Sequence, residues 1–328
     1  MYRIALDAMG GDHAPGPVVH GAYLAVKKYP VHITLVGQID IVRKEAAKYK
    51  DWPESKVSFH NASEVVGMSE SPSISFRRKK HSSIRVGLSL VKEGVVDGFV
   101  SAGNTGAVMA ASILLLGKTN NVERPAIATV FPSKKGPVVV LDMGSNVDCK
   151  ASYLEQFAVM GSCLAETVLK KKFPKIGLLN IGEEKGKGNS AAQEAYDLIK
   201  KQPLNFVGNI EGKDIILGKT EVVVCDGFVG NSILKFGEGI VSVFFSFFKE
   251  EAKSSLISLL GMFLLRPALK RLKKEFNYEE YGGAPLLGVN GVSIVAHGSS
   301  SAKAIKNAIA TGIEAIETNM VKKINGAL

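Results

Sequence analysis

The chain has 328 residues, of which 46% are hydrophobic and 22% charged, a composition typical of a globular protein and unlike that of a disordered chain. Its three cysteines form no C-x-x-C pair, so neither a disulfide framework nor a zinc site is predicted, and a reducing cytoplasm fits best. The sequence runs from Met1 directly into a strand-like stretch without a basic segment or cleavage motif, so we expect no signal peptide.

The formal net charge is +10. Its simplest interpretation is solubility. Its other interpretations require an acidic partner, which could be nucleic acid, anionic lipid or an acidic carrier protein. Aromatic residues make up only 7% of the chain and form no RNA-stacking motif, so we predict no nucleic-acid partner.

The first predicted unit of structure is a strand, a loop, a helix and a second strand. The strands are expected at Tyr2–Ala8 and His32–Val36, with a helix over Val18–Lys28 between them. This order is typical of a βαβ unit and favours a parallel sheet. The loop after the first strand carries Gly10, Gly11, Asp12 and His13.

The pattern of a Val- and Ile-rich strand followed by a polar glycine loop recurs along the chain. Further strands are predicted at 95–101, 136–141, 175–180, 222–225 and 292–296, with helices at 107–116, at 153–170 and after residue 300. The strands do not alternate cleanly between apolar and polar residues, which is typical of a sheet covered on both faces. We therefore predict an α/β fold, with a Rossmann-like, mostly parallel sheet and helices on both faces.

One region interrupts this rhythm. Asn231–Ala252 is expected to form an amphipathic helix, and Leu256–Leu265 is apolar but shorter than the ~20 residues that span a bilayer. Arg266–Pro267 is expected to open another helix, whose polar face carries Lys270, Arg271, Lys273 and Lys274 and whose apolar face includes Phe276. We predict one α/β domain over residues 1–328, with two lobes as the alternative, and a projecting helical subdomain at 232–280.

The glycine-rich loops indicate an anion site. Glycine lets backbone N–H groups face a ligand, and a helix N-terminus adds positive potential. Ligands in open α/β sheets lie beyond the carboxyl ends of the strands, where each of these loops falls, so we expect a single composite site. For each loop the alternative is an ordinary turn or helix cap. The candidate phosphate-binding residues are Asp7, Gly10, Gly11, Asp12, Gly103, Asn104, Thr105, Asn146, Asp148, Asn189, Asp226 and His297.

Three residues are candidates for catalysis. Lys187 lies in a glycine-flanked loop, from which its ammonium could reach a phosphate or an oxyanion; Lys185 is the alternative. Asn231 could donate to an oxyanion, and His13 could act as a general acid. Cys225 at a strand end could be a nucleophile, but no histidine lies near it in the sequence, so a buried apolar role is favoured. No metal-ligand spacing, dinucleotide fingerprint or P-loop is present.

Taken together, these segments resemble the PlsX family of phosphate acyltransferases. The chain departs from the family pattern at Ser145, where members usually have Ala, and near Ala151, where members often have Pro. The glycine pattern after Glu184 varies among members. The matching stretches run in order from end to end of the chain: Ala5–His13, Ser101–Ala107, Arg124–Ala126, Asp142–Asp148, Leu179–Glu184, Cys225–Asn231, Tyr281–Ala284 and Ala296–Ser299.

The resemblance implies that inorganic phosphate attacks the thioester of an acyl-acyl carrier protein, giving acyl phosphate and free carrier. The acyl phosphate would then feed a membrane glycerol-3-phosphate acyltransferase at the start of phospholipid synthesis. The resemblance also implies a fold like that of isocitrate and isopropylmalate dehydrogenases and of phosphotransacetylase. A homodimer without a redox cofactor is expected.

The projecting helices then have two expected roles. Their wide apolar stripe suits dimer packing, and their tip suits shallow insertion beside the headgroups of an anionic membrane surface. A cytoplasmic protein that binds the membrane peripherally is therefore predicted, with burial of the tip in the protein core as the alternative. The predicted membrane-contact residues are Leu256, Leu259, Leu260 and Phe263.

Three other functions stay open at this point. Transfer from a small acyl-CoA, as in phosphotransacetylase, is disfavoured by the long apolar helices. A dehydrogenase is disfavoured because the dinucleotide fingerprint is missing, although the related fold does not require it. A non-catalytic membrane-surface scaffold would leave the polar glycine loops without a purpose.

Overall fold

The computed structural model describes residues 1–275 and 282–328, with side chains described up to residue 272 and from 282. The predicted features at Lys273, Lys274, Phe276 and Tyr281 lie outside this description. Eleven strands in the described residues form one sheet. From edge to edge their order is β3 (Val57–Asn61), β2 (Val31–Gly37), β1 (Tyr2–Asp7), β4 (Gly98–Ser101), β11 (Val292–Val295), β10 (Ala284–Leu287), β5 (Ala126–Phe131), β6 (Val138–Leu141), β9 (Val222–Val224), β7 (Ile176–Leu179) and β8 (Phe206–Ile210).

The sheet is mostly parallel, as predicted, but it contains two parallel blocks. The first is β3-β2-β1-β4-β11 and the second is β6-β9-β7-β8. Between them, β10 and β5 are each antiparallel to both of their neighbours. The two blocks therefore run in opposite directions. The carboxyl ends of their strands, where the glycine loops begin, lie on opposite sides of the sheet rather than on the single side that we expected.

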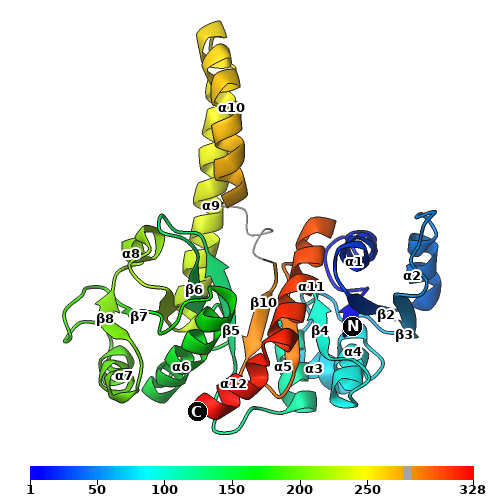
Figure 1. Ribbon diagram of the computed structural model, residues 1–328, viewed down its shortest axis with the longest axis horizontal. Helices are drawn as coiled ribbons and strands as arrows, with labels where there is room; N and C mark the ends of the chain where they lie inside the picture. Colours follow the sequence, from blue (N-terminus) through cyan, green and yellow to red (C-terminus); the bar gives the residue numbers. More distant parts are fainter. Residues whose placement is uncertain (276–281) are drawn as a thin grey trace.

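Twelve helices are described around the sheet (Figure 1). They are α1 (Gly16–Lys28), α2 (Ile39–Ala46), α3 (Pro72–Arg78), α4 (Ser83–Lys92), α5 (Thr105–Leu116), α6 (Ala151–Val168), α7 (Ser190–Lys201), α8 (Gly212–Leu217), α9 (Gly227–Glu251), α10 (Leu256–Glu275), α11 (Ala302–Glu317) and α12 (Met320–Ala327).

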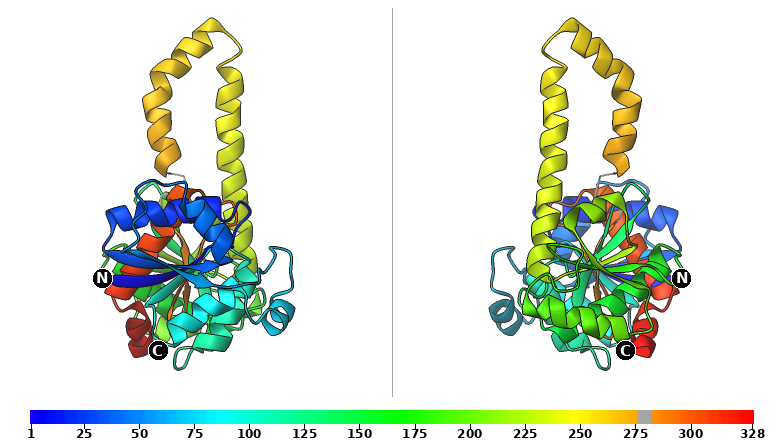
Figure 2. Two further views of the ribbon diagram at one scale, coloured as in Figure 1. Left: turned by 90° about the vertical axis from the view of Figure 1, so that its right-hand side faces the viewer. Right: turned by 90° about the vertical axis from the view of Figure 1, so that its left-hand side faces the viewer.

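The sheet is buried on both faces, which explains why its strands lack alternation. In β1, Ile4 and Leu6 belong to one core cluster and Ala5 between them belongs to another. The core cluster that contains Ile4 and Leu6 runs under α1, α2, α6, α7, α11 and α12 across both blocks. On the other face, α4 and α5 cover the first block, whereas α8 and the base of α9 cover the second. Figure 2 shows these two helical layers with the sheet between them.

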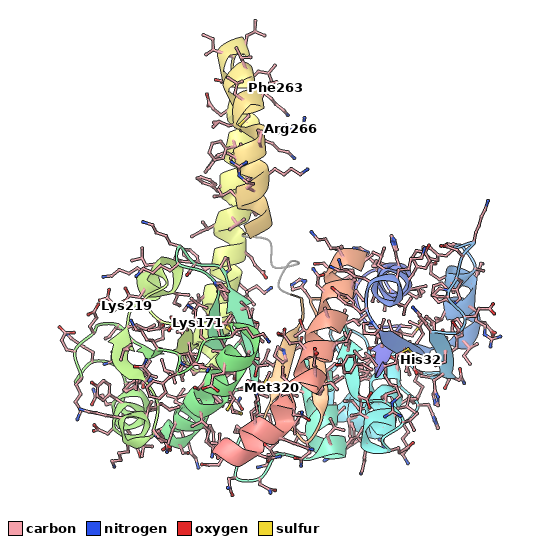
Figure 3. All side chains as sticks on the ribbon, viewed as in Figure 1. His32, Lys171, Lys219, Phe263, Arg266 and Met320 are labelled. Atoms are coloured by element: carbon pink, nitrogen blue, oxygen red, sulfur yellow. The ribbon has the colours of Figure 1, made fainter. Side chains whose placement is uncertain are left out.

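Helices α9 and α10 form a hairpin that projects from the body (Figures 1 and 2). Phe236, Phe247 and Leu260 on this hairpin are each more than 60% exposed. Phe263 and Arg266 lie on its outer part, away from the sheet (Figure 3). By length and composition alone, α9 would be long and apolar enough to cross a membrane.

One predicted helix boundary in the hairpin is wrong. Arg266–Pro267 does not open a helix, because α10 runs continuously from Leu256 to Glu275 with Pro267 inside it. A proline inside a helix removes one backbone hydrogen bond and costs about 3 kcal/mol. In this segment, the length of the helical pattern predicts where the helix begins better than the preference of proline for the first turn.

Candidate functional site

The loops after β1, β4 and β11, here called the first cluster, are organised around the carboxylate of Asp7. This side chain ends β1 and is 1% exposed. It accepts hydrogen bonds from the Ser101 hydroxyl at 2.7 Å and from the Met9 backbone N–H at 3.1 Å. Burial raises its pKa, and these hydrogen bonds oppose the rise in part. Asp7 therefore fixes these loops from their buried side.

Gly10 and Gly11 bring the β1 loop against its neighbours. A Cβ on Gly10 would lie 2.7 Å from the backbone nitrogen of Gly103, so only glycine permits this approach. Gly11 adopts φ +114°, a conformation that favours glycine. The next N–H, from Asp12, donates to the carbonyl oxygen of Gly298 at 2.8 Å. The loops that carry Gly10, Gly103 and His297 are thus brought together, as the sequence predicts.

Both the oxygen and the nitrogen of the Asn104 side-chain amide form hydrogen bonds within the protein. Its Oδ1 accepts from the Ala107 N–H and so caps α5, while its Nδ2 donates to the carbonyl oxygens of Gly67, Met68 and Glu70 at 2.9–3.2 Å. Its side chain thus fastens the 67–70 segment to the first cluster. The next residue, Thr105, is exposed at the first turn of α5.

Two histidines border the first cluster. His13 is exposed in the turn that follows Asp12. His297 forms a hydrogen bond to the Ser299 hydroxyl at 2.8 Å through Nδ1 and to the ammonium of Lys235 at 3.2 Å through Nε2. Lys235 lies on α9, which begins in the second block, so this contact joins the two halves of the molecule. The sequence did not single out Lys235. Its position one helical turn after Asn231 could have indicated that it shares a helix face with a candidate site residue.

The loops after β6, β9 and β7, here called the second cluster, repeat the arrangement found at Asp7. Asp142 is fully buried at the end of β6. One carboxylate oxygen accepts from the backbone N–H groups of Ile127 and Ser145 and from the Ser145 hydroxyl. The other accepts from the backbone and side-chain amides of Asn146 at 2.6 and 3.0 Å. Burial raises the pKa of Asp142, and the amide of Asn146 is committed to holding this loop.

The first turn of α9 packs against the Asp142 loop. Asp226 caps the helix by accepting from the Val229 N–H at 2.8 Å, and the Gly227 N–H donates to the Asn146 carbonyl at 2.7 Å. A Cβ on Gly230 would overlap the carbonyl oxygen of Asp142. The following residue, Asn231, is exposed beside Gly144. Asp148, in the same loop as Asn146, is exposed as well.

Lys187 occupies a loop that is held at several points. Asn180 donates to the Lys187 carbonyl at 3.0 Å, and Gln193 donates to the carbonyls on either side, of Gly186 and Gly188. Asn189 caps α7 through its Oδ1. The loop backbone is therefore fixed while the Lys187 side chain is exposed.

The two lysines of this loop differ in their contacts. The ammonium of Lys185 lies 2.6 Å from the carboxylate of Asp197. In the described part of the chain, the ammonium of Lys187 has no hydrogen bond or ion pair. This difference favours Lys187 over Lys185 as the group available to a ligand.

Cys225 is buried, and burial raises the pKa of its thiol well above the ordinary value, which disfavours the thiolate. The residues that the structure describes contain no group of three His, Cys, Asp or Glu side chains placed to hold a metal ion.

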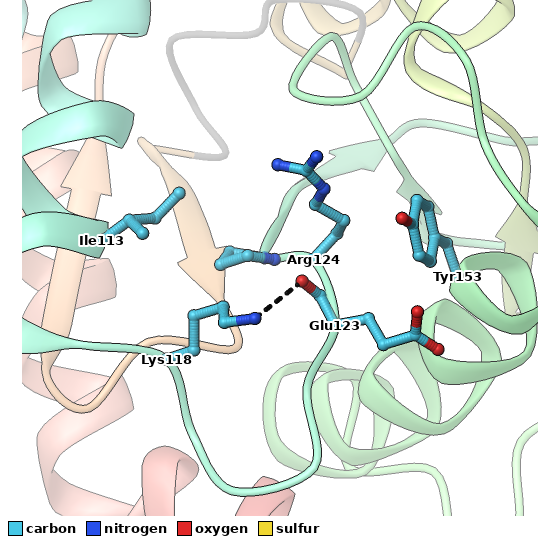
Figure 4. Close-up of a pocket in the computed structure, with 6 residues that line it drawn as sticks. Ile113, Lys118, Glu123, Arg124 and Tyr153 are labelled. Carbon is cyan, nitrogen blue, oxygen red and sulfur yellow. Dashed lines mark hydrogen bonds between the residues drawn. The ribbon is translucent and has the colours of Figure 1, made fainter. Parts of the chain in front are cut away.

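A pocket of about 350 Å³ lies beside the second cluster (Figure 4). The sequence analysis did not single it out, although Arg124 and Pro125 belong to a stretch that carries the family resemblance. The carbonyl oxygen of Pro125 accepts from the Asn146 side chain at 2.8 Å, which attaches the pocket to the Asp142 loop. Its lining residues are Ile113, Lys118, Glu123, Arg124, Pro125 and Tyr153.

Solved structures share the fold at low sequence identity. A phosphotransacetylase from Streptococcus pyogenes matches with a TM-score of 0.66 and 18% identity, covering 96% of this chain and 94% of its own. A 4-hydroxythreonine-4-phosphate dehydrogenase from Klebsiella pneumoniae matches with a TM-score of 0.55 and 14% identity, covering 96% and 100%. The fold is thus of the phosphotransacetylase class, which also includes dehydrogenases.

The family follows from sequence comparison. A family model described as "Fatty acid synthesis protein" matches residues 2–323. Relatives named phosphate acyltransferase are 50% identical over 322 residues in Heliobacterium modesticaldum and over 328 residues in Desulforamulus reducens, covering 98% and 100% of this chain and 96% and 98% of theirs. The chain belongs to this family, the PlsX family of phosphate acyltransferases, as its motifs predict, and it is an acyltransferase.

Gly230→Ala should damage both folding and activity. The new methyl group must displace either α9 or the Asp142 carbonyl, and with it the adjacent Asn231, so we expect the free energy of unfolding to fall by about 1–3 kcal/mol. Gly239→Ala in the same helix is the matched control, because a Cβ there meets nothing within 4 Å; it should stabilise by about 0.5–1 kcal/mol. Urea denaturation measures the stability of both variants, and equal stability would contradict this account.

The buried Asp7 should make stability depend on pH. Its pKa in the folded protein lies above the ordinary value of 3.8, so the folded state keeps this proton when the unfolded state has lost it. The contribution of Asp7 to stability is therefore complete below pH 3.8 and declines as pH rises through the raised pKa, by at most ~1.4 kcal/mol per pH unit. Relative to Asp7→Asn, the wild-type protein should lose stability from pH 4 upward in urea denaturation. A difference that stays constant with pH would show that the carboxyl titrates normally.

Proposed function

We propose that the protein transfers an acyl group from acyl-acyl carrier protein to inorganic phosphate, giving acyl phosphate and free carrier. Its family supports the chemistry. The observation that carries the residue assignment is that the side chains of Asn231 and Lys187 are exposed and form no hydrogen bond among the described residues. The two residues follow the adjacent strands β9 and β7. The amides of Asn104 and Asn146, by contrast, are committed to the fold.

Asn231 shares a helix face with Lys235, which contacts the first cluster. Residues four apart on a helix share a face, with Cβ atoms about 6 Å apart, so Asn231 lies one turn from Lys235, which contacts His297. The base of α9 can therefore bring the two clusters together even though their strands run in opposite directions. This supports a composite site around the first two turns of α9.

In the proposed reaction, a phosphate oxygen attacks the thioester carbonyl, a C–O bond forms, and the tetrahedral oxyanion collapses with cleavage of the C–S bond. Phosphate is already a nucleophile, so the protein has to hold it in line and stabilise the oxyanion. We assign oxyanion stabilisation to Lys187 and Asn231 and protonation of the leaving thiolate to His13. The backbone N–H of Gly11, with Thr105 and His297, would bind phosphate. The N–H groups of Gly103 and Asp12 already donate to the Ser101 hydroxyl and the Gly298 carbonyl, so Gly10, Gly103 and Asp12 would shape this loop.

Several predicted phosphate-binding residues would act indirectly. Asp7, Asn104, Asn146, Asn189 and Asp226 each already accept or donate a hydrogen bond within a loop or at a helix cap. We therefore propose that they position the loops rather than touch the anion. Asp148, exposed in the Asp142 loop, stays a prediction.

The acyl donor and the fate of the product are also part of this proposal. The net charge of +10 suits an acidic carrier protein, and acyl phosphate would pass to a glycerol-3-phosphate acyltransferase in the membrane, the first step of phospholipid synthesis. Transfer from a small acyl-CoA is the second candidate, because the matching phosphotransacetylase shares this fold, although fold alone does not assign a substrate.

The hairpin supports a proposal for membrane contact and dimerisation. Leu256 is 86% exposed, and Leu259, Leu260 and Phe263 are all more than half exposed, so the tip is not core in this chain. Arg266 and Lys270 follow on the same helix, and cations beside apolar residues suit an anionic membrane surface. The exposed apolar side chains nearer the base of α9, such as Phe236 and Ile240, suit packing in a homodimer. We place the protein in the cytoplasm, bound peripherally to the membrane.

The purified protein, mixed with acyl-acyl carrier protein and phosphate, should form acyl phosphate that hydroxylamine traps as a hydroxamate. Lys187→Ala should lower kcat about 10²- to 10³-fold, because a donor to the oxyanion is lost, and it should stay folded because the side chain is exposed. Lys185→Ala is the matched control and should retain most activity. Hydroxamate formed only from acyl-CoA would favour the second candidate, and near-normal turnover by Lys187→Ala would remove Lys187 from the mechanism.

The double variant Leu259→Glu/Leu260→Glu should abolish co-sedimentation with liposomes containing anionic lipid. Two carboxylates at the tip oppose both insertion and the surface charge, whereas acyl phosphate formation in solution should stay unchanged. A double substitution of exposed residues remote from the tip, Ile41→Glu/Ile74→Glu, is the control. Undiminished liposome binding by the tip variant would contradict membrane contact at this position.

A further inference from the structure

The pocket between α5 and α6 has the size and charge of a site for a small organic anion. Its volume of about 350 Å³ falls within the range of ligand pockets, roughly 300–1,000 Å³. Lys118 and Arg124 contribute two positive charges and Glu123 one negative charge. Tyr153 adds a hydroxyl and Ile113 an apolar wall, so the lining suits a ligand with both an anionic and an apolar part.

The guanidinium of Arg124 is the group most available to such a ligand. It is exposed and has no hydrogen bond or ion pair within residues 1–275 and 282–328. The ammonium of Lys118 donates to the carbonyl oxygen of Glu123 at 3.1 Å, which leaves its other two N–H groups. In Figure 4 the Tyr153 hydroxyl points toward Arg124, and the Glu123 carboxylate is turned away from Lys118. The positive groups therefore have no fixed carboxylate partner in the pocket.

A helix end adds to this positive potential. Tyr153 lies in the first turn of α6, an 18-residue helix that begins at Ala151. No side chain caps this turn with a hydrogen bond, and it contains no acidic residue. The positive end of the helix dipole thus acts together with Arg124 and Lys118.

We propose that this pocket binds the phosphate ester of a phosphopantetheine arm, the carrier of the acyl thioester. The inference rests on the proposed thioester donor and adds where the donor is held. A phosphate ester suits a guanidinium and an ammonium, because their N–H groups donate charge-assisted hydrogen bonds to its oxygens. The rest of the arm, with two amides and short apolar segments, suits the apolar wall and the hydroxyl of Tyr153.

The position of the pocket fits the length of such an arm. Ile113, which lines the pocket, lies nine residues along α5 from Asn104 in the first cluster, or about 13 Å at 1.5 Å per residue. An extended pantetheine arm is comparable to about five peptide residues, ~17 Å. On the other side, Pro125 is hydrogen-bonded to Asn146 of the second cluster. A thioester whose phosphate lies at Arg124 can therefore reach the loops that carry the proposed chemistry.

Arg124→Gln tests the inference with acyl donors that differ in the phosphate group. For acyl-phosphopantetheine, acyl-CoA and acyl-acyl carrier protein, the variant should raise KM about ten-fold or more, since a charge-assisted contact is lost. For acyl-pantetheine, which lacks the phosphate, KM should stay unchanged, as should kcat and the KM for inorganic phosphate. Arg78→Gln, at another exposed arginine, is the matched control with the small donors and should behave as the wild-type protein.

Calorimetric titration of free phosphopantetheine tests the same contact without catalysis, so its result does not depend on the proposed reaction. Weaker binding to Arg124→Gln than to the wild-type protein and Arg78→Gln is expected even if no acyl phosphate is formed. Unchanged binding would overturn the inference. So would equal losses for acyl-pantetheine and acyl-phosphopantetheine, a loss confined to acyl-CoA, or a raised KM for inorganic phosphate alone.

Discussion

The candidate site depends on two carboxylates that are buried at the ends of strands. Asp7 ends β1 and Asp142 follows β6, and each accepts hydrogen bonds from the loop that follows it; Asp7 also accepts one from the Ser101 hydroxyl of β4. A buried carboxylate loses its hydration, and a dense set of N–H and O–H donors offsets part of that loss. The loops are therefore fixed by the need to satisfy these two groups. Asn231, the residue directly after the first turn of α9 that packs on the Asp142 loop, takes its position from this constraint.

The two carboxylates occupy equivalent places in oppositely directed halves of the sheet. In an all-parallel sheet, the carboxyl ends of all strands, and hence all of these loops, would lie on one side of the sheet. Here β10 and β5 reverse the direction between the blocks, so the halves need a connecting element. The base of α9 supplies it, because it begins on the Asp142 loop and reaches the His297 loop through Lys235 within three turns.

The sequence predicted the repeated strand–loop units, the covering of both faces and the family, because these depend on local composition and motif order. It did not predict the reversal, because β5 and β10 were not recognised as strands and strand direction is set by tertiary pairing. It identified Asn104 as a site residue but not its role, since the carbonyls of Gly67, Met68 and Glu70 that hold its amide are more than 30 residues away. The choice between Lys185 and Lys187 likewise depended on Asp197, a residue in the following helix.

Helix α9 is continuous from Gly227 to Glu251. Its first residue is hydrogen-bonded to the Asn146 carbonyl, and its last turn leads to the hairpin tip. A helix of 25 residues is about 37 Å long, and its stiffness makes that length a fixed spacing. The loops of the candidate site are thus set at a constant height below the tip, so any surface on which the tip rests also determines how far from that surface these loops lie.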